Sequence, residues 1–482
     1  MDQIVLIGYF VSLSILFVFG LHGFVMIYYH RKYGSNNPVP KKHFDEDPIV
    51  TIQLPLYNEM YVVERLINAI CEIEYPKDKM EIQVLDDSTD ETTSIVAKIV
   101  ELKKQDGFDI AHIRRGTREG FKAGALKEGM KIAKGEYIAI FDADFIPQKE
   151  FLRKTLSFFN DDKVGMVQTR WEHLNGDYSI ITKAQALALD GHFVIEQSVR
   201  NKSGFFINFN GTGGIWRKKC IEEAGNWHAD TLTEDLDLSY RAQLIGWRFV
   251  FLKDFTSPAE LPSEINALKA QQFRWTKGAV ETAKKILPLV WKSKVPLRVK
   301  LQSTFHLTNN LVFPFILLAA ILNVPLIFVK NSGSHEAYFA IMSIFVLAFI
   351  SSFLFYLYSQ KDIRTDWRKK MVLFPLFMAG SMGLAVNNSR AVFEGLMNRK
   401  SEFVRTPKFK QESEKDSWAG NKYLNRKLGF SVIVEAILAV YCFIGVLSSI
   451  YFLELASIPF QVLFFLGFSF MAVTSIKHAY SK

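Results

Sequence analysis

The sequence predicts two kinds of structure in one chain: an α/β domain with a Rossmann-like, mostly parallel sheet, and a set of transmembrane α-helices. Two observations support this prediction. Short β-type runs alternate with helical runs between about Asp47 and Leu261, as is typical of a parallel sheet covered by helices. Long apolar runs lie on both sides of this region, and each is long enough to cross roughly 30 Å of hydrocarbon.

The composition agrees with a membrane-bound protein of more than one domain. The chain has 482 residues, of which 49% are hydrophobic, and a net charge of +9. Much of the positive charge lies beside the apolar runs, as on the cytoplasmic flanks of spans, and it also suits an anionic substrate. It therefore does not indicate a nucleic acid as partner. Cys71, Cys220 and Cys442 are far apart, which predicts neither a disulfide framework nor a cysteine-based metal site.

The first apolar run, Ile4–Tyr29, carries no full charge and is followed by basic residues. It is too long for the core of a signal peptide, so we interpret it as a span whose C-terminal end lies in the cytoplasm. Further runs form two closely spaced pairs: Leu311–Val329 with Ala337–Tyr358, and Phe430–Phe452 with Leu455–Ile476. In this topology the N-terminus lies outside, the C-terminus inside, and the large polar segments face the cytoplasm.

Two apolar features leave alternatives open. Met371–Val386 is short, contains Pro375 and has basic residues on both sides, so the positive-inside rule favours an interfacial or re-entrant segment over a span. Glu435 lies within a predicted span. An acid there faces a pore or satisfies a buried partner, and the sequence favours neither interpretation.

The α/β region divides into predicted strands and helices. The strands are Ile49–Leu54, Glu81–Leu85, Asp109–Ile113, Tyr137–Phe141, Val164–Thr169 and Trp247–Leu252. The helices are Met60–Glu72, Ser88–Lys104, Ala123–Lys134 and Ile180–Arg200.

Asp142 and Asp144 follow the strand Tyr137–Phe141 at a spacing of two residues. Strand side chains alternate between faces, so the two carboxylates project to the same side at the strand's carboxyl end, where α/β sheets bind ligands. Two hard oxygen donors at that place suit Mg²⁺ or Mn²⁺. The alternative is an aspartate turn or helix cap, which would be favoured if the pair stood alone.

A second pair of acids, Asp86 and Asp87, follows the predicted strand Glu81–Leu85, where a carboxylate can accept a hydrogen bond from a base or a ribose. A turn role is about equally favoured for each. Ser88 and Glu91 have the spacing of a capping box for the following helix. Lys122 stands between two glycines at a predicted helix start, where backbone N–H groups favour anions, although a solvated surface lysine is the alternative. No Walker A pattern occurs in the sequence.

Two constellations follow downstream. Thr231 and Glu234 have the spacing of another capping box, which leaves Asp235 free to act as a base; we expect the helix start to keep it ionised. Gln271, Arg274 and Trp275 share one face of a helix, where Arg suits phosphate and Trp suits stacking on a sugar ring. The alternative for this face is a helix in the membrane interface.

The ordered set of these motifs resembles the processive family 2 glycosyltransferases, which include the cellulose, chitin and hyaluronan synthases. It is most similar to the cellulose-synthase-like A and C proteins of plants, the (gluco)mannan and glucan synthases. The resemblance covers nearly the whole chain, and its stretches are Val84–Asp90, Lys122–Leu126, Phe209–Arg217, Glu260–Ser263 and Gln271–Trp275.

The resemblance implies a GT-A fold, an inverting transfer from a nucleoside-diphosphate sugar, and the following roles. Asp86, Asp87, Lys122, Asp142 and Tyr57 would bind the donor nucleotide, and Asp144 with Asp142 would hold Mg²⁺ or Mn²⁺. Asp235 would be the general base with Glu234 beside it, and Gln271, Arg274 and Trp275 would bind the diphosphate and the acceptor sugar. Phe403, Thr406 and Lys408 would form a gating loop over the donor site.

Two departures argue against cellulose as the product. Arg405 stands where bacterial cellulose synthases carry Val, and Asn210 lies in a stretch that contains Cys in those enzymes. Our hypothesis is therefore a membrane-embedded synthase that polymerises a β-linked glucan or mannan from UDP-glucose or GDP-mannose and passes the growing glycan through its spans. Transfer of one sugar to a lipid acceptor is the alternative, and a transporter or scaffold with an inactive domain is a further rival.

The predicted domain organisation follows from these assignments. It comprises a transmembrane helix (1–33), a GT-A domain (47–262), interface helices (263–310), a transmembrane pair (311–358), an interfacial helix with the gating loop (359–428) and a second transmembrane pair (429–476). We expect a multi-pass protein of a cell inner or plasma membrane, or of the Golgi in a eukaryote, with the catalytic domain in the cytosol.

Overall fold

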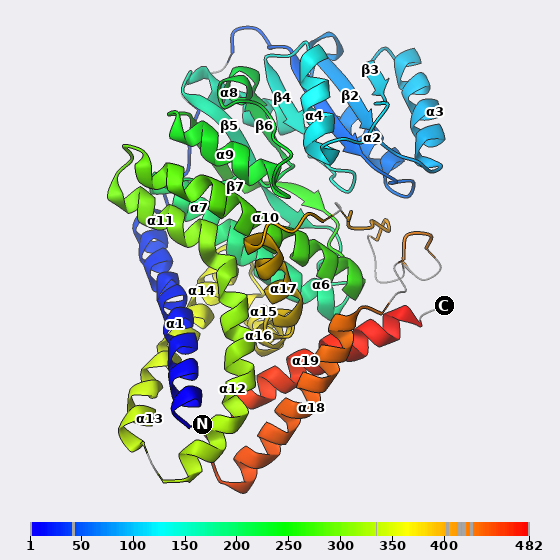
Figure 1. The fold of residues 1–482 in the computed structure, drawn as a ribbon. Helices are drawn as coiled ribbons and strands as arrows, with labels where there is room; N and C mark the ends of the chain where they lie inside the picture. Colours follow the sequence, from blue (N-terminus) through cyan, green and yellow to red (C-terminus); the bar gives the residue numbers. More distant parts are fainter. Residues whose placement is uncertain are drawn as a thin grey trace.

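The structure, a computed structural model, describes residues 2–40, 44–333, 335–401, 404–411, 416, 421–424 and 428–480. It has two parts, an α/β domain built on one sheet and a group of long helices below it (Figure 1). Helix α10 (Ile265–Lys292) lies between the two parts. It packs against α9 (Glu234–Leu244) of the α/β domain and against α17 (Ala385–Leu396) and α19 (Ile458–Ala479) of the helical part.

Within the described residues, the sheet has seven strands in the order β3-β2-β1-β4-β6-β5-β7. The strands are β1 (Val50–Leu56), β2 (Met80–Asp86), β3 (Asp109–Ile113), β4 (Tyr137–Ile140), β5 (Val164–His173), β6 (Gly214–Arg217) and β7 (Arg248–Ala259). Strand β6 runs antiparallel to both of its neighbours, and the other neighbouring pairs are parallel. The predicted mostly parallel α/β fold is confirmed.

Every strand that the sequence predicts is present, but β6 was not predicted and two strands are longer than expected. Strand β6 is short and begins in a glycine-rich run, which gives little strand signal. Strands β5 and β7 continue together beyond a register shift at Thr169/Arg170. Pro258 argues against a strand there, yet it is tolerated because β7 is at the edge of the sheet.

Helices cover both faces of the sheet, as the alternating pattern predicts. One face carries α2 (Val63–Cys71), α3 (Thr92–Gln105) and α5 (Phe151–Leu156), whose apolar side chains join one core cluster. The other face carries α4 (Phe121–Ile132), α8 (Lys218–Glu223) and α9 (Glu234–Leu244), which pack around a second cluster. Because both faces are buried, functional side chains are confined to the strand ends.

The predicted helix Ser88–Lys104 begins later than expected, at Thr92. The Ser88 hydroxyl accepts a hydrogen bond from the backbone N–H of Asn58 (2.8 Å) instead of capping the helix, and a carboxylate oxygen of Asp90 accepts from the Thr92 N–H (3.0 Å). The predicted capping box of Ser88 and Glu91 is therefore wrong. The sequence spacing could not reveal a competing partner on another loop.

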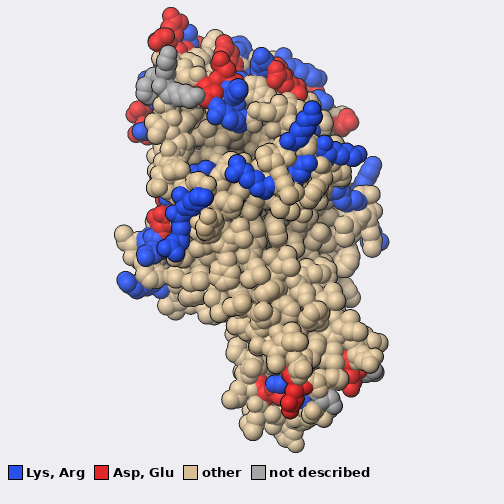
Figure 2. All heavy atoms as spheres, turned by 90° about the vertical axis from the view of Figure 1, so that its left-hand side faces the viewer, with Lys and Arg blue, Asp and Glu red and all other residues tan. Residues whose placement is uncertain are grey.

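Among the described residues, five helical segments are long and apolar enough to cross a membrane. They are α1 (Asp2–Tyr33), α11 with α12 (Leu297–Thr308 and Phe313–Asn331), α13 with α14 (Glu336–Met342 and Val346–Ile363), α18 (Phe430–Tyr451) and α19 (Ile458–Ala479). Figure 2 shows a broad uncharged surface between the charged α/β domain and a few charges at the far tip. The N-terminus lies at the end of the helical part remote from the sheet (Figure 1).

The ambiguous segment Met371–Val386 forms parts of three shorter helices, α15 (Trp367–Met371), α16 (Phe374–Gly383) and α17 (Ala385–Leu396). None of them is among the candidate spans, which agrees with the expected five crossings. An interfacial or re-entrant position for this segment stays a prediction.

The buried acid Glu435 of α18 has a partner. Lys269 of α10 donates hydrogen bonds to the Glu435 carboxylate (2.6 Å) and to the Ser475 hydroxyl of α19 (2.8 Å). Both charged side chains are buried, so the pair fastens α10 to the candidate spans α18 and α19. Two interpretations were left open for Glu435. The structure agrees with the one in which the buried acid is paired with another side chain of the protein.

Candidate active site

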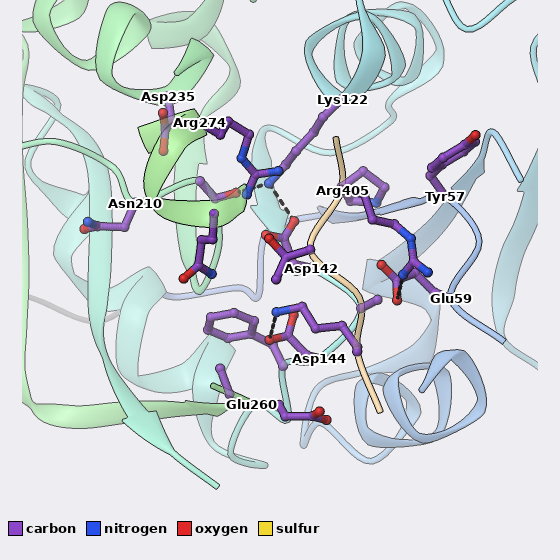
Figure 3. Close-up of a pocket in the computed structure, with 18 of the residues that line it drawn as sticks. Tyr57, Glu59, Lys122, Asp142, Asp144, Asn210, Asp235, Glu260, Arg274 and Arg405 are labelled. Atoms are coloured by element: carbon purple, nitrogen blue, oxygen red, sulfur yellow. Dashed lines mark hydrogen bonds and ion pairs between the residues drawn. The ribbon is translucent and has the colours of Figure 1, made fainter. Parts of the chain in front are cut away.

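A pocket opens at the edge of the sheet where the parallel strands end (Figure 3). The segments after β1, β2, β4 and β7 contribute residues to it. Because β6 is antiparallel, the segment before it, with Asn210 and Gly211, reaches the same edge. The predicted site residues that line this pocket are Tyr57, Asp87, Lys122, Asp142, Asp144, Glu234, Asp235, Gln271, Arg274, Trp275, Thr406 and Lys408.

Asp142 and Asp144 both line the pocket, as the strand-end spacing predicts. Each carboxylate is bonded to a lysine. Lys122 donates to Asp142 (2.6 Å), and Lys408 donates to Asp144 (2.6 Å). The backbone N–H of Asp142 also donates to the Thr212 hydroxyl (2.8 Å), which fixes the turn that carries both acids.

Lys122 lies in the first turn of α4, where the sequence predicts an anion site. Its ammonium also donates to the backbone carbonyl of Gly211 (2.9 Å). Although burial lowers the pKa of Lys122, the carboxylates of Asp142, Glu234 and Asp235 raise it above its ordinary value. The ammonium is thus charged and central to the pocket, which fits a role in binding anions.

Asp86 and Asp87 differ in position. Asp86 is buried outside the pocket lining, and its oxygens accept from the Ser88 N–H (2.9 Å) and bond the His112 ring (2.8 Å). Asp87 lines the pocket and forms a close ion pair with Arg115. Of the two acids, Asp87 is therefore the one placed to contact a ligand.

Asp235 and Glu234 begin α9 side by side, and both line the pocket. One Asp235 oxygen accepts from the Leu236 N–H of the same helix (2.8 Å). Burial and the neighbouring Glu234 carboxylate raise the pKa of Asp235 to about 7, against the opposing charge of Lys122. The expectation that the helix start keeps Asp235 fully ionised is therefore wrong, because burial outweighs it. A carboxylate with this pKa is suited to accept a proton near neutral pH.

The predicted capping box at this helix start is not formed either. Thr233 is the capping residue and makes no side-chain cap hydrogen bond. The buried Thr231 hydroxyl has no hydrogen-bond partner among the described residues. Glu234 is consequently not engaged in capping and faces the pocket.

Helix α10 contributes Gln271, Arg274 and Trp275 from a single face, which confirms the predicted geometry. Burial lowers the pKa of Arg274, while the carboxylates of Glu234 and Asp142 oppose that effect. A guanidinium in this acidic pocket provides several N–H donors at fixed directions, which suits phosphate oxygens.

Comparison with known proteins identifies the family to which the α/β domain is similar. Residues 48–278 match the family described as "Glycosyltransferase like family 2". This part of the chain is a domain of that family. The chain is 41% identical over 268 residues to glucomannan 4-beta-mannosyltransferase 1 of Oryza sativa subsp. japonica, which covers 55% of this chain and 51% of the relative. It is 36% identical over 374 residues to probable glucomannan 4-beta-mannosyltransferase 10 of Arabidopsis thaliana, with 75% of this chain and 65% of the relative covered.

The chain thus spans between about half and two thirds of the length of these curated relatives. Among solved structures, the mannosyltransferase PcManGT from Pyrobaculum calidifontis, in complex with GDP-Man and Mn²⁺, is similar with a TM-score of 0.57 and 18% sequence identity. The match covers 82% of this chain and 100% of that chain. This likeness supports the GT-A-like fold of the glycosyltransferase domain.

A loop from the helical part reaches the glycosyltransferase domain and closes one side of the pocket. Thr406 and Lys408 line the pocket as predicted, whereas Phe403 lies outside the described residues. Arg405 forms an ion pair with Glu59 (2.8 Å), and the backbone N–H of Phe409 donates to the Glu260 carboxylate (2.9 Å). The loop is therefore fastened to the segments that follow β1 and β7.

Several pocket residues were not predicted as site residues: Glu59, Arg118, Trp171, Asn210 and Glu260. Asn210 and Glu260 lie in stretches that the sequence singles out, but their side chains were given no role. Arg118 lies over the ring of Tyr57, with its guanidinium carbon 3.3 Å from the ring centroid, and Trp171 lies in the last part of β5. No spacing pattern marks these two residues, because they reach the pocket only through the fold.

A second acidic cluster, His228 with Asp230 and Asp237, has the geometry of a metal site. The ammonium of Lys285 lies 2.9 Å from Asp230, 2.9 Å from Asp237 and 3.1 Å from His228. Arg241 pairs with Asp237 as well (2.8 Å). Basic side chains thus balance both groups of acids, but Asp142 and Asp144 line the pocket and this cluster does not, so the Asp142–Asp144 pair is the better candidate for a metal that acts on a pocket ligand.

Proposed function

We propose that this protein is a membrane-embedded inverting hexosyltransferase that polymerises a β-linked polysaccharide of the mannan or glucomannan type. The donor is a nucleoside-diphosphate sugar, and GDP-mannose is the first to test because the similar curated proteins are named as glucomannan 4-beta-mannosyltransferases. The observation that carries the proposal is one pocket that gathers an acid pair, a base candidate and the polar face of α10.

The donor occupies the side of the pocket formed by β1, β2 and the loop 404–411. Asp87 and Tyr57 bind the nucleoside, since they lie at the ends of these strands and line the pocket. Lys122, Arg274 and Lys408 bind the diphosphate, because their positive charges converge on the acid pair. Binding of the diphosphate releases the two lysines from the carboxylates that they now contact.

Asp142 and Asp144 fit a divalent metal ion. They are hard oxygen donors on one turn of the chain, and each is balanced in this structure by a lysine ammonium on one oxygen. A bound Mg²⁺ or Mn²⁺ would stabilise negative charge on the leaving diphosphate. The solved neighbour with GDP-Man and Mn²⁺ supports the choice of ion.

Asp235 removes the proton from the attacking hydroxyl of the acceptor sugar. The hydroxyl oxygen forms a bond with the anomeric carbon of the donor as the bond to the diphosphate breaks, and this single displacement inverts the anomeric configuration. Glu234 raises the proton affinity of Asp235, and Trp275 provides a flat apolar face for the acceptor ring. No second nucleophile is needed for this reaction.

The domain organisation follows the same proposal. Residues 47–262 form the catalytic domain in the cytosol, and residues 263–310 connect it to the spans. The chain crosses the bilayer with α1 and the two later helix pairs, and the segment 359–428 carries the interfacial helix and the gating loop. The N-terminus then faces away from the cytosol, which agrees with its position remote from the sheet (Figure 1).

The test is turnover by the purified full chain in lipid nanodiscs with Mn²⁺ or Mg²⁺. Each of GDP-mannose, GDP-glucose and UDP-glucose is supplied, release of the nucleoside diphosphate is followed, and the product is digested with β-mannanase or cellulase. We expect long, mannanase-sensitive chains from GDP-mannose. A product that is only a lipid-soluble monoglycoside would replace polymerisation by lipid transfer, and absence of turnover with every donor would overturn the proposal.

A further inference from the structure

A second pocket, of about 430 Å³, lies where the candidate spans α1 and α14 end next to β7. Its lining residues come from the end of α1 and the turn after it, from the end of α14 and from β7: His30, Arg31, Gly34, Ser35, Asn37, Lys253, Tyr358 and Asp362. None of them lines the active-site pocket. The second pocket is therefore a separate feature, placed where the glycosyltransferase domain meets the helical part.

Several donor groups around this pocket have no partner in the part of the chain that the structure describes. The Arg31 guanidinium forms neither an ion pair nor a hydrogen bond, and the hydroxyl groups of Ser35 and Tyr358 form no hydrogen bond. A guanidinium offers N–H groups in a fixed fork, and a hydroxyl rotates to suit its partner. This combination of donors is suited to the oxygens of a phosphate group.

Lys253 of β7 brings a positive charge into the pocket from the glycosyltransferase domain. Its side chain is 11% exposed, and its ammonium lies 2.8 Å from Asp362 and 3.6 Å from Asp254. Of these two acids only Asp362 lines the pocket, and it also lies 3.9 Å from the His30 ring. Apart from His30, the lining thus has two cations, Arg31 and Lys253, against one carboxylate, and this excess favours an anion.

The wall formed by the turn after α1 is fastened to the glycosyltransferase domain. The Lys202 ammonium, at the end of α7 (Ser198–Lys202), donates to the backbone carbonyl of Gly34 (2.6 Å) and to the side-chain oxygen of Asn37 (2.8 Å). The Asn37 amide nitrogen donates to Asp254 (3.2 Å). Burial lowers the pKa of Lys202, and the positive charge of Lys253 lowers it further. Cations therefore repel one another beside this pocket, which a bound anion would relieve.

The position of the pocket favours a phosphate that belongs to a lipid. Figure 2 shows Lys and Arg side chains along the border between the α/β domain and the uncharged surface below it. Tyr28 precedes Arg31 by three residues, shares its face of α1 and is 58% exposed, so aromatic surface continues below the guanidinium. Tyrosine is typical of the level at which lipid headgroups lie, and basic pockets between spans on the cytoplasmic side suit anionic headgroups.

We propose that this pocket binds the phosphate group of an anionic phospholipid of the cytoplasmic leaflet, with Arg31, Lys253 and the Tyr358 hydroxyl as donors. The acyl chains follow the apolar surfaces of α1 and α14. The bound lipid connects β7 of the glycosyltransferase domain to the bilayer. This inference goes beyond the proposed function and uses from it only the placement of the two helices in the membrane.

The test measures lipid binding to the full chain. Native mass spectrometry of the protein in a neutral detergent follows titrations with phosphatidylglycerol, which is anionic, and with phosphatidylcholine, which carries no net charge. We expect the first phosphatidylglycerol molecule to bind at least about fivefold more tightly than the first phosphatidylcholine, as for one basic side chain beside a headgroup. Equal affinities for the two lipids would overturn the proposal.

A pair of single variants locates the site. R31Q removes a charge-assisted donor, so we expect its affinity for phosphatidylglycerol to fall about tenfold. K32Q is the matched control, since Lys32 is the next residue, carries the same charge and does not line the pocket. Its affinity should stay within about twofold of the wild type, as for an exposed charge. Unchanged binding by R31Q, or an equal loss in both variants, would overturn the proposal.

A double variant separates a built site from general attraction. K253Q/D362N removes two opposite charges together and leaves the net charge of the pocket unchanged. We expect a loss of about tenfold, because the ammonium donor is absent. General attraction between charges predicts no loss, and affinity near that of the wild type would therefore count against Lys253 as a donor.

Glycerol 3-phosphate, which has the phosphate but no acyl chains, distinguishes a lipid from a soluble phosphate. We expect it not to displace phosphatidylglycerol at equal concentration, because it lacks the apolar contacts of the chains. Displacement at equal concentration would make the pocket a site for soluble phosphates and overturn its assignment to a lipid. None of these measurements involves a sugar donor or turnover, so failure of this inference leaves the proposed function intact.

Discussion

On the donor side of the pocket, carboxylates are bonded to cations of the chain. Lys122 contacts Asp142, and Lys408 contacts Asp144. On the base side, Asp235 lies next to a second acid, Glu234, and its main-chain hydrogen bond comes from its own helix. Burial and that neighbour raise its pKa to about 7.

The difference shows how one pocket supports two kinds of chemistry. A carboxylate bonded to a cation favours its charged form and can exchange that cation for a metal or a substrate contact. A buried carboxylate beside a like charge binds a proton more readily, which is the property that a general base needs near neutral pH. The carboxylates on the two sides of the pocket thus differ in their chemistry because different charged groups lie beside them, and not because their residue types differ.

The base side is tested by D235N, from which we expect the largest effect. Loss of a general base lowers the rate by roughly 10²- to 10⁴-fold, while GDP affinity stays near the wild-type value because Asp235 does not contact the diphosphate in our proposal. Release of the nucleoside diphosphate and calorimetric titration of GDP measure the two quantities. D230N is the control, since Asp230 lies nearby in the Lys285 cluster outside the pocket. Turnover by D235N at a rate near that of the wild type would remove the base assignment.

The donor side is tested by D144N, which removes one of the two acids. We expect Mn²⁺ binding, measured by electron paramagnetic resonance, to weaken by at least the roughly 10- to 100-fold that loss of a supporting group causes at metal sites. Chelation of the metal should abolish turnover by the wild type, and added Mn²⁺ should restore it. The matched variant D237N changes the other acidic cluster, His228 with Asp230 and Asp237. If D237N loses as much Mn²⁺ affinity as we expect for D144N, while D144N keeps the wild-type affinity, the metal lies at that cluster instead.

Much of this arrangement was predictable from residue spacing, because spacing fixes which side chains share a face. Asp142 and Asp144 at a strand end, and Gln271, Arg274 and Trp275 on a helix, reach one pocket as expected. The helix starts were less predictable. Ser88 has the spacing of a cap, but its hydroxyl accepts a hydrogen bond from Asn58 on another loop.

The cation partners of the acids could not be predicted from the sequence. Lys408 and Asp144 are separated by 264 positions, and their contact depends on the path of the loop that carries Lys408. The same holds for the second pocket, between α1 and α14, since its residues come from three segments that no spacing pattern connects. Electrostatic differences between acids arise from such long-range contacts, so sequence alone did not reveal the raised pKa of Asp235.

The contrast between the sides also predicts a pH dependence of turnover. Asp235 accepts a proton only in its ionised form, so with a pKa of about 7 the rate rises about tenfold per pH unit below that value and levels off above it. A pH profile of nucleoside diphosphate release at saturating donor measures this. Glu59 also has a pKa raised to about 7 by burial, so the E59Q variant serves as the control and should keep the same profile. A flat wild-type profile across neutral pH would contradict the assignment to Asp235.

The smallest effect is expected for the Arg405–Glu59 pair, which fastens the loop to the donor side. R405L leaves a buried carboxyl group without its partner, which costs about 1–3 kcal/mol and lowers the melting temperature by roughly 2–8 °C. The double variant R405L/E59Q also removes the charge of the Glu59 carboxylate. We therefore expect it to recover most of the melting temperature that R405L loses. Thermal unfolding of the full chain in nanodiscs, followed by tryptophan fluorescence, measures both. If the two substitutions lower the melting temperature additively, the residues act independently, and the donor side does not depend on this ion pair to hold the loop in place.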